Sequence, residues 1–300
     1  MYKIDLNADY KRFEEMWEYR ENRKMNHSSS AWDNRAEDWG KELEKNGGFQ
    51  KSLSDRVSRV SEYLRNHGLL TQDSRVIDIG CGPGRFVAEF ARTSKHVTGM
   101  DISPEMLKLG AEYAKKEGLS NVSFVAGDFR EFDISDAGWE NQFDLVFTSI
   151  TPAIGTLNSL EKLMKICRGY CFNSCFVRWE DNIERRISEE VLGIPYRPSH
   201  GKHDIWFYSL FNLLWLKGYF PETSYHRQNC SEYADADADL ARYYSRTFSE
   251  NLQEDDEMTE KILDFLKKNS DSGGKIIREY QRWYGWILWD TRIRSKRLPE

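Results

Sequence analysis

Three glycines directly after a short apolar segment could bring the backbone close to a ligand. The segment VIDI at 76–79 is typical of a buried strand, and it runs into Gly80, Gly82 and Gly84. Glycine lets the backbone turn sharply and approach a ligand without interference from a Cβ atom. A helix predicted to start near Arg85 points its free N–H groups at that ligand. In open α/β folds, ligands bind at this place, beyond the carboxyl end of a strand.

The spacing of these glycines differs from that of dinucleotide-binding turns. Those turns follow G-x-G-x-x-G, whereas here the third glycine comes one residue early and Arg85 occupies the expected place. With Asp78 inside the strand, the turn resembles the first motif of class I S-adenosylmethionine-dependent methyltransferases. That family also carries an acidic residue at the end of the second strand, where Asp101 stands. The further matches are ISPEM at 102–106, GDF at 127–129 and FDLV at 143–146, and the resemblance covers residues 75 to about 177.

The resemblance implies that the cofactor is S-adenosyl-L-methionine, with S-adenosyl-L-homocysteine as its product. It implies that Asp101 binds the ribose hydroxyls and Asp128 the adenine amino group, with an apolar neighbour against the ring. Any one of these aspartates could instead cap a helix or a turn, but the features occur in order and in register. The residues assigned to the cofactor in this way are Asp78, Gly80, Cys81, Gly82, Gly84, Asp101, Ile102, Met106, Gly127, Asp128, Phe129, Thr148 and Trp32.

An amphipathic segment precedes the sheet. SAWDNRAEDW at 30–39 resembles the N-terminal helix of many small-molecule members of the family, which lies over the cofactor and closes the site. The alternative is a helix whose Trp32 and Trp39 merely pack on the domain. Both readings remain open at this point.

The order of predicted elements indicates the fold class. Strands alternate with helices, which argues for a parallel sheet covered on both faces. We expect a doubly wound, mostly parallel, Rossmann-like α/β sheet of seven strands with the last one antiparallel, a helical N-terminal cap and a helical insert before the last strand. The expected division is a cap or lid at 1–70, a cofactor-binding core at 71–180, and a C-terminal part of the same domain at 181–300 with a substrate loop. In that part we predict a helix at 206–216, strands at 222–227 and 276–289, and the insert at 251–268.

The exit from the fourth strand excludes two kinds of methyltransferase. TSITPA at 148–153 lacks the Asn/Asp-Pro-Pro-aromatic sequence that enzymes acting on base or glutamine amino groups often carry there. It also lacks the acidic metal ligand of catechol-type members. We therefore expect direct in-line methyl transfer without a metal.

The sequence identifies no catalytic residue. A general base is needed only if the acceptor is a hydroxyl or an ammonium group. Candidates are His200, His203 and Tyr208, while Arg178 suits a carboxylate on the substrate. Both histidines lie in a polar loop, PSHGKHD at 198–204, and an ordinary exposed loop is the alternative reading.

Cys167, Cys171 and Cys175 are spaced by four, which on a helix would gather three thiols into a soft-metal site. The surrounding run at 170–177 reads better as a strand. We expect the strand to break the shared face and the cysteines to be buried and structural, with no metal site.

The composition indicates the class of acceptor molecule and the cellular compartment. Lys and Arg number 43 against 49 Asp and Glu, a formal charge of −6, which disfavours a nucleic-acid partner. With the N-terminal lid, this favours a small, enclosed acceptor molecule. No stretch is apolar enough for a signal peptide or a membrane span, and five cysteines suit a reducing compartment, so we expect a cytoplasmic enzyme without a membrane partner. The alternatives are an RNA or protein methyltransferase, a non-catalytic cofactor-binding protein and a nicotinamide-dependent oxidoreductase.

Overall fold

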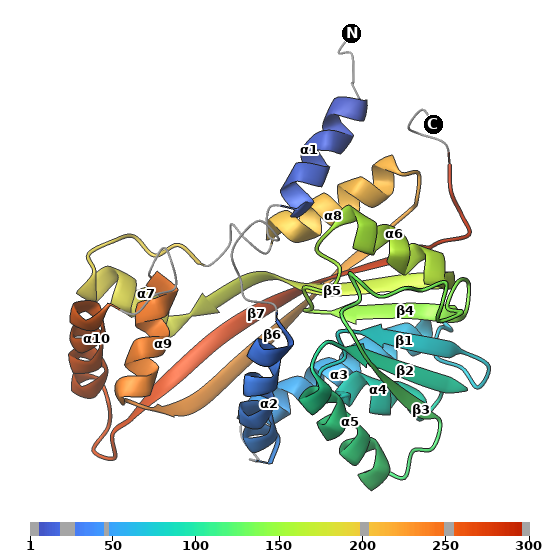
Figure 1. Ribbon diagram of the computed structural model, residues 1–300. Helices are drawn as coiled ribbons and strands as arrows, with labels where there is room; N and C mark the ends of the chain where they lie inside the picture. Colours follow the sequence, from blue (N-terminus) through green and yellow to red (C-terminus); the bar gives the residue numbers. More distant parts are fainter. Residues whose placement is uncertain (1–5, 19–27, 45–47, 199–203, 249–254, 296–300) are drawn as a thin grey trace. The chain divides into compact units, whose positions relative to one another are not determined.

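The computed structural model describes residues 6–18, 28–44, 48–198, 204–248 and 255–295 (Figure 1). The chain divides into two compact units. Unit 1 comprises the described residues within 1–176, 202–226 and 284–300, and unit 2 those within 177–201 and 227–283. The predicted segments 1–70, 71–180 and 181–300 divide the chain by position along the sequence, and they remain a prediction.

A seven-stranded sheet has the order β3-β2-β1-β4-β5-β7-β6. The strands are β1 (Arg75–Ile79), β2 (His96–Asp101), β3 (Val122–Ala126), β4 (Phe143–Ser149), β5 (Cys167–Asp181), β6 (Glu222–Asp235) and β7 (Lys275–Asp290). Strand β1 pairs in parallel with β2 and β4, β2 with β3, and β4 with β5. Helices cover both faces and one strand is antiparallel, which confirms the predicted doubly wound α/β class.

The helices of unit 1 cover the sheet, and the apolar residues of β1, β2 and β4 beneath them are buried, as is usual in a parallel sheet. Helices α4 (Arg85–Ala91) and α5 (Pro104–Lys116) pack on β2 and β3, and α6 (Leu157–Ile166) packs on β4 (Figure 1). The rings of Phe147 and Phe172 stack across β4 and β5 with centroids 5.3 Å apart. Phe86 and Phe90 of α4 contact the ring of Phe147 at 4.7 and 4.9 Å. This aromatic core fixes the strand ends from which the glycine turn departs.

Helices α1 (Leu6–Glu18), α2 (Ser29–Glu44) and α3 (Gly48–Asn66) precede β1, so the predicted helical N-terminal part is present. Helix α1 packs on α8 (Asp204–Leu216), where the rings of Trp17 and Trp206 lie 5.0 Å apart. Glu18 at the end of α1 accepts a hydrogen bond from the backbone N–H of Leu157 at 3.3 Å. Helix α2 packs on α5.

Unit 2 contains the ends of β5, β6 and β7 together with α7 (Asn182–Arg186), the π-helical turn η1 (Ile187–Val191), α9 (Ala238–Phe248) and α10 (Asp256–Lys268). Its core includes Ile187, Tyr244, Ile262 and Leu266, all fully buried. The predicted strand at 222–227 is too short, because β6 continues to Asp235. Its second half alternates exposed and half-buried positions, mostly with polar residues, which gives a weak sequence signal. Helix α9 was not predicted, while α10 confirms the described part of the helical insert.

The expectation for the three cysteines was partly wrong. Cys167, Cys171 and Cys175 are buried in β5, as expected. However, residues four apart in a strand lie on the same face, because side chains alternate with period two. In keeping with a shared face, the Cys171 thiol lowers the pKa of the Cys167 thiol, while burial and then Cys167 raise the pKa of Cys171. Within the part of the chain that the structure describes, no cluster of three or more His, Cys, Asp or Glu residues is suited to a metal ion.

None of the described helices combines the length and the apolar character needed to cross a membrane.

Candidate functional site

The turn after β1 is held against β2 by its own backbone. The N–H groups of Gly80 and Cys81 both donate to the carbonyl oxygen of Met100, at 2.7 and 3.0 Å. Gly80 and Gly82 have φ angles of +74° and +50°, in the left-handed region that favours glycine. A Cβ on Gly80 would lie 2.1 Å from the hydroxyl oxygen of Thr151, whereas a Cβ on Gly82 would meet nothing within 4 Å. The turn is therefore packed beneath Gly80 and open at Gly82.

Two further residues of the turn, Cys81 and Gly84, are packed against the protein interior. A Cβ on Gly84 would lie 3.1 to 3.2 Å from Gly110 of α5 and the ring of Phe124, so the third glycine allows close packing. The Cys81 side chain is 7% exposed, and burial, then the charges of Asp78 and Asp101, raises the pKa of its thiol well above the usual value. Cys81 can therefore offer a ligand only its backbone.

Asp101 ends β2 beside this turn. Its Oδ2 accepts a hydrogen bond from the Gly82 N–H at 2.8 Å, and its Oδ1 accepts one from the Ser103 N–H at 2.9 Å. Burial raises the pKa of this carboxyl and the nearby charge of Asp33 adds to the effect, while backbone hydrogen bonds from Ser103, Gly82 and Ile102 oppose it. Each oxygen keeps a lone pair, so the fixed carboxylate can accept two neighbouring hydroxyl groups.

Asp78 in β1 is the least satisfied polar side chain at this edge. The residue is 2% exposed, and its Oδ2 has no hydrogen-bond partner among the described residues. Burial raises the pKa of the carboxyl well above its usual value, the charge of Asp101 adds to this, and the charge of Arg56 opposes it. A buried carboxyl next to an open glycine turn fits a ligand that carries a donor or a positive charge.

Helix α2 reaches the same loop through Asp33. The Ser103 hydroxyl donates to Asp33 Oδ1 at 2.5 Å, and it also accepts the N–H of Met106 as the N-cap of α5. Trp32 is half-buried and its ring lies 4.7 Å from the guanidinium carbon of Arg35. The segment at 30–39 is thus helical and held at the end of β2.

The loop after β3 follows the same edge. The Gly127 N–H donates to the Asp101 carbonyl oxygen at 2.9 Å. Asp128 accepts hydrogen bonds from the Arg130 N–H and guanidinium at 3.0 and 2.9 Å. Burial acts to raise the pKa of Asp128, but Arg130 and the charge of Lys162 outweigh it and the pKa is lowered. Asp128 is therefore held as a carboxylate.

Lys162 of α6 is a residue that the sequence analysis missed. Its ammonium donates to the carbonyl oxygens of Phe129, Arg130 and Phe132 at 3.0, 2.7 and 2.9 Å, and it lies 5.7 Å from the centre of the buried Phe129 ring. It therefore ties the loop after β3 to α6. A single lysine in a helix carries no sequence signal of such a role.

Thr148 near the end of β4 has its hydrogen bonds within the sheet. This residue is fully buried, its hydroxyl donates to the Phe172 carbonyl oxygen at 3.1 Å, and it accepts from the Asn173 side chain at 2.9 Å. The side chain thus joins β4 to β5, and its assignment to the cofactor stays a prediction. Ile150 follows with φ at +52°, an outlier for a β-branched residue, and such strain concentrates at functional sites. Ser149 Oγ is buried there without a partner among the described residues.

Ile102 is half-buried and Met106 is buried, so both line the protein side of the loop after β2. The catalytic candidates that the structure describes are Tyr208, in unit 1, and Arg178, in unit 2. Tyr208 on α8 is 54% exposed with its ring edge-on to Phe13, and Arg178, in unit 2, is paired with Glu180. His200 and His203 lie outside the described residues. All of these assignments stay predictions.

Comparison with known proteins places this geometry in a family. Residues 70–192 match a family model described as "Methyltransferase domain". Sterol 24-C-methyltransferase ERG6B of Gibberella zeae is 29% identical over 122 residues, which are 39% of this chain and 32% of that protein. Human EEF1A lysine methyltransferase 2 is 28% identical over 131 residues, 40% of this chain and 55% of that protein. The matches thus span between about a third and about half of these relatives.

Among solved structures, magnesium protoporphyrin IX methyltransferase of Synechocystis PCC 6803, with bound SAH, is similar with a TM-score of 0.50. The two chains are 14% identical, and the match covers 86% of this chain and 96% of the other, so this likeness concerns the fold. The sheet order, the glycine turn, Asp101 and the matched family model agree. Residues 70–192 form a methyltransferase domain of the class I S-adenosylmethionine-dependent family.

Proposed function

We propose that this chain binds S-adenosylmethionine at the glycine turn and transfers its methyl group to a small-molecule acceptor, by direct in-line displacement and without a metal. The observation that carries the proposal is the Asp101 carboxylate, fixed by the N–H groups of Gly82 and Ser103 next to the unpartnered Asp78 Oδ2. One carboxylate can accept two ribose hydroxyls, and the other suits the ammonium group of the methionine part.

Further roles follow from the loops. The Asp128 carboxylate, with its lowered pKa, can accept from the adenine amino group, while the Gly127–Asp128–Phe129 backbone forms the side of the ring site. The cofactor's sulfonium makes the methyl group electrophilic without help from the protein. The residues of the chain must therefore chiefly align the acceptor with the S–CH₃ bond and exclude water.

Two observations support a small acceptor. Helix α2 is held at the end of β2 through Asp33, beside the proposed ribose site, which supports a role as a helix that covers the cofactor. The formal charge of −6 disfavours a nucleic-acid acceptor. Relatives named sterol 24-C-methyltransferases are consistent with a small acceptor, and the relatives named EEF1A lysine methyltransferase 2 support a protein acceptor as the second candidate.

Calorimetry of the purified chain with S-adenosylmethionine, S-adenosylhomocysteine and NAD tests the cofactor. We expect micromolar binding of both sulfur compounds and none of NAD. Asp101→Ala removes two charge-assisted hydrogen bonds, each worth about 1.5 to 3 kcal/mol, so binding should weaken by about 100-fold or more. Asp73→Ala, at an exposed acid just before β1, is the matched control and should bind normally. Preference for NAD, or no binding of either sulfur compound, contradicts the proposal.

Labelled methyl groups then separate the acceptor classes. The labelled cofactor is incubated with the enzyme and a cell extract split into small-molecule and macromolecular fractions. We expect Asp101-dependent label in the small-molecule fraction. Label confined to protein would replace the small acceptor by the second candidate, and no label in either fraction would indicate a binding protein.

A further inference from the structure

We propose that Asp33 is a positioning residue that couples the docking of helix α2 to cofactor binding, acting through Ser103 on the ribose-binding Asp101. The inference rests on the proposed function, because it names the residue through which cofactor binding would affect helix α2.

The contacts form one continuous chain. Within α2, Ser29 Oγ donates to Asp33 Oδ2 at 3.2 Å. The other oxygen of Asp33 accepts the Ser103 hydroxyl at 2.5 Å, although the two residues are 70 positions apart. The Ser103 N–H donates to Asp101 Oδ1, and Asp101 Oδ2 accepts from Gly82. Helix α2 and the glycine turn are therefore joined through two carboxylates and one serine.

Ser103 is suited to this link because it is fully buried and its groups are all in use. Its hydroxyl oxygen accepts the Met106 N–H as the N-cap of α5, at 3.1 Å. Its hydroxyl has a single proton, and Asp33 receives it. The orientation of the Ser103 side chain thus depends on Asp33, and the backbone N–H of Ser103 donates to Asp101. A serine needed only as a helix cap would not require a partner from another helix.

The contacts of Ser103 explain why the two events should favour each other. Burial raises the pKa of Asp101 and the charge of Asp33 adds to this, so the charges alone oppose the coupling. The Ser103 hydroxyl, however, donates to Asp33 while its N–H donates to Asp101, so a docked α2 holds the Asp101 carboxylate in the arrangement that receives the ribose hydroxyls. Occupation of the ribose site should therefore strengthen α2 docking. By thermodynamic linkage, a docked α2 must strengthen cofactor binding by the same factor.

The test combines calorimetry with S-adenosylhomocysteine and hydrogen exchange of α2 (Ser29–Glu44), with and without that ligand. In the unmodified chain the ligand should slow exchange in α2. Asp33→Ala should lose this protection and bind about 5- to 150-fold more weakly, the range of typical coupling free energies between two sites. Asp33→Asn keeps an acceptor oxygen for Ser103 and should retain most of both effects. Glu105→Ala removes an exposed acid from the first turn of α5 and should behave as the unmodified chain.

A double-mutant cycle assigns the effect to Ser103. In a Ser103→Ala background, Asp33→Ala should change the affinity less than twofold.

The inference is overturned if Asp33→Ala leaves both affinity and α2 protection unchanged, if Asp33→Asn binds as weakly as Asp33→Ala, or if Asp33→Ala has its full effect without Ser103. If the unmodified chain does not bind S-adenosylhomocysteine, the proposed function fails together with this inference. Binding by the unmodified chain with no effect of Asp33→Ala refutes the inference alone. The melting temperature of Asp33→Ala without ligand shows whether this variant is correctly folded. If it is not, the affinities of Asp33→Asn and of the double-mutant cycle test the inference.

Discussion

Two buried aspartates, one in each unit, have opposite surroundings. In unit 1, Asp78 is 2% exposed and its Oδ2 lacks a partner among the described residues. In unit 2, Asp181 is equally buried but accepts from the N–H groups of Ile183 and Glu184 at 2.9 and 3.1 Å. It also accepts the Tyr244 hydroxyl at 3.0 Å and the Arg278 guanidinium at 2.7 Å.

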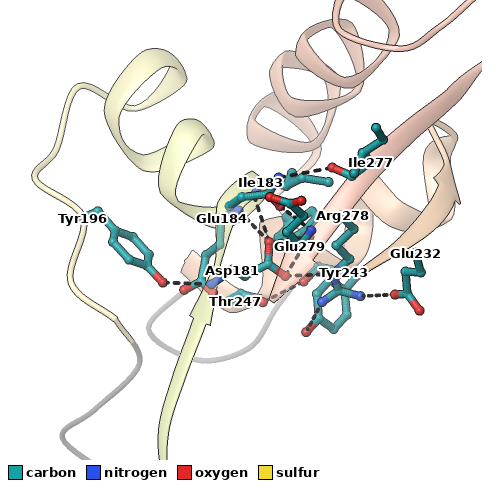
Figure 2. A network of polar contacts seen from close by, with 12 residues as sticks. Asp181, Ile183, Glu184, Tyr196, Glu232, Tyr243, Thr247, Ile277, Arg278 and Glu279 are labelled. Carbon is teal, nitrogen blue, oxygen red and sulfur yellow. Dashed lines mark hydrogen bonds and ion pairs between the residues drawn. The ribbon is translucent and has the colours of Figure 1, made fainter. Parts of the chain in front are cut away.

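The network around Asp181 holds several elements together, as Figure 2 shows for the residues at the end of β5, on β7 and on α9. Arg278 of β7 bridges Asp181 and Glu232 of β6, with an N···O distance of 3.6 Å to the latter. Its guanidinium carbon lies 5.0 Å from the Tyr243 ring centre and 5.1 Å from that of Tyr280. Described residues of unit 2 thus supply Asp181 and Arg278 with charge partners, hydrogen bonds and aromatic faces.

The difference teaches how to separate a structural carboxylate from a ligand-binding one. A buried polar group costs free energy unless it has hydrogen-bond partners, so a chain that only has to fold satisfies it, as at Asp181. Asp78 lies near the end of β1 and the strained Ile150 directly follows β4, and the next residue, Thr151, packs against Gly80 of the glycine turn. Residues that are unsatisfied in the free protein are those a ligand can complete.

Asp181→Ala should have the largest effect on stability. It removes the partner of Arg278 and the N-cap of α7, and breaking a buried ion pair costs about 3 to 5 kcal/mol. We expect much faster hydrogen exchange in α9 and α10. Asp235→Ala breaks only an exposed pair with Lys275 and should cost less than about 1 kcal/mol. Similar exchange in the two variants would show that the network is not what stabilises unit 2.

Glu184→Gln should change how the free energy of unfolding depends on pH. Burial, then the charge of Asp181, raises the pKa of Glu184 from 4.5 to about 7, while Arg278 opposes the shift. Between these values the folded state binds more protons than the unfolded state, so stability falls as pH rises through the window. The variant should therefore gain about 2 to 3 kcal/mol over the unmodified chain at pH 8 and nothing at pH 4 in denaturant unfolding. Glu189→Gln, at an exposed site of η1, should show no such difference; a gain that is independent of pH would refute the explanation.

Asp78→Asn should stabilise the free protein while weakening ligand binding. The folded-state pKa is raised, so the carboxyl destabilises the fold increasingly as pH rises above its usual value, and the neutral amide avoids this. We expect a gain in stability at pH 8, none near pH 3, and about tenfold weaker binding of S-adenosylhomocysteine. Chemical denaturation and calorimetry measure the two. Lower stability at pH 8 would place Asp78 with Asp181 as a structural residue.

Lys162→Met should have the smallest effect of these variants, a modest loss of affinity for S-adenosylhomocysteine. The variant keeps the length of the side chain but loses the donors to the carbonyl oxygens of Phe129, Arg130 and Phe132. The loop after β3 should loosen and S-adenosylhomocysteine should bind about 3- to 10-fold more weakly by calorimetry. Lys165→Met, an exposed neighbour on α6, is the control. If the two variants bind equally, Lys162 does not position the loop after β3 for binding.

The parts of the site that could be predicted are those encoded by neighbouring residues. The strand at 76–79 and the glycines after it form a local pattern, and the structure shows β1 and a turn with positive φ angles there. The strand ending at Asp101 and the helix after Pro104 are local for the same reason. Thr148 could not be judged from sequence, because its hydrogen bonds come from Phe172 and Asn173 of another strand.

The sequence by itself determined the order of strands and helices, the glycine turn and the family of the domain, because periodicity, turn chemistry and motif spacing involve residues close along the chain. Only the tertiary structure decided which polar groups are satisfied. Asp78 and Asp181 are both acidic residues within strands. Nothing near them in sequence says that Asp181 meets Arg278, or that Asp78 Oδ2 has no hydrogen-bond partner among the described residues. The contact of Asp33 with Ser103 is of the same kind. Such contacts depend on burial and on partners distant in the sequence, which exist only once the sheet has brought its strand ends together.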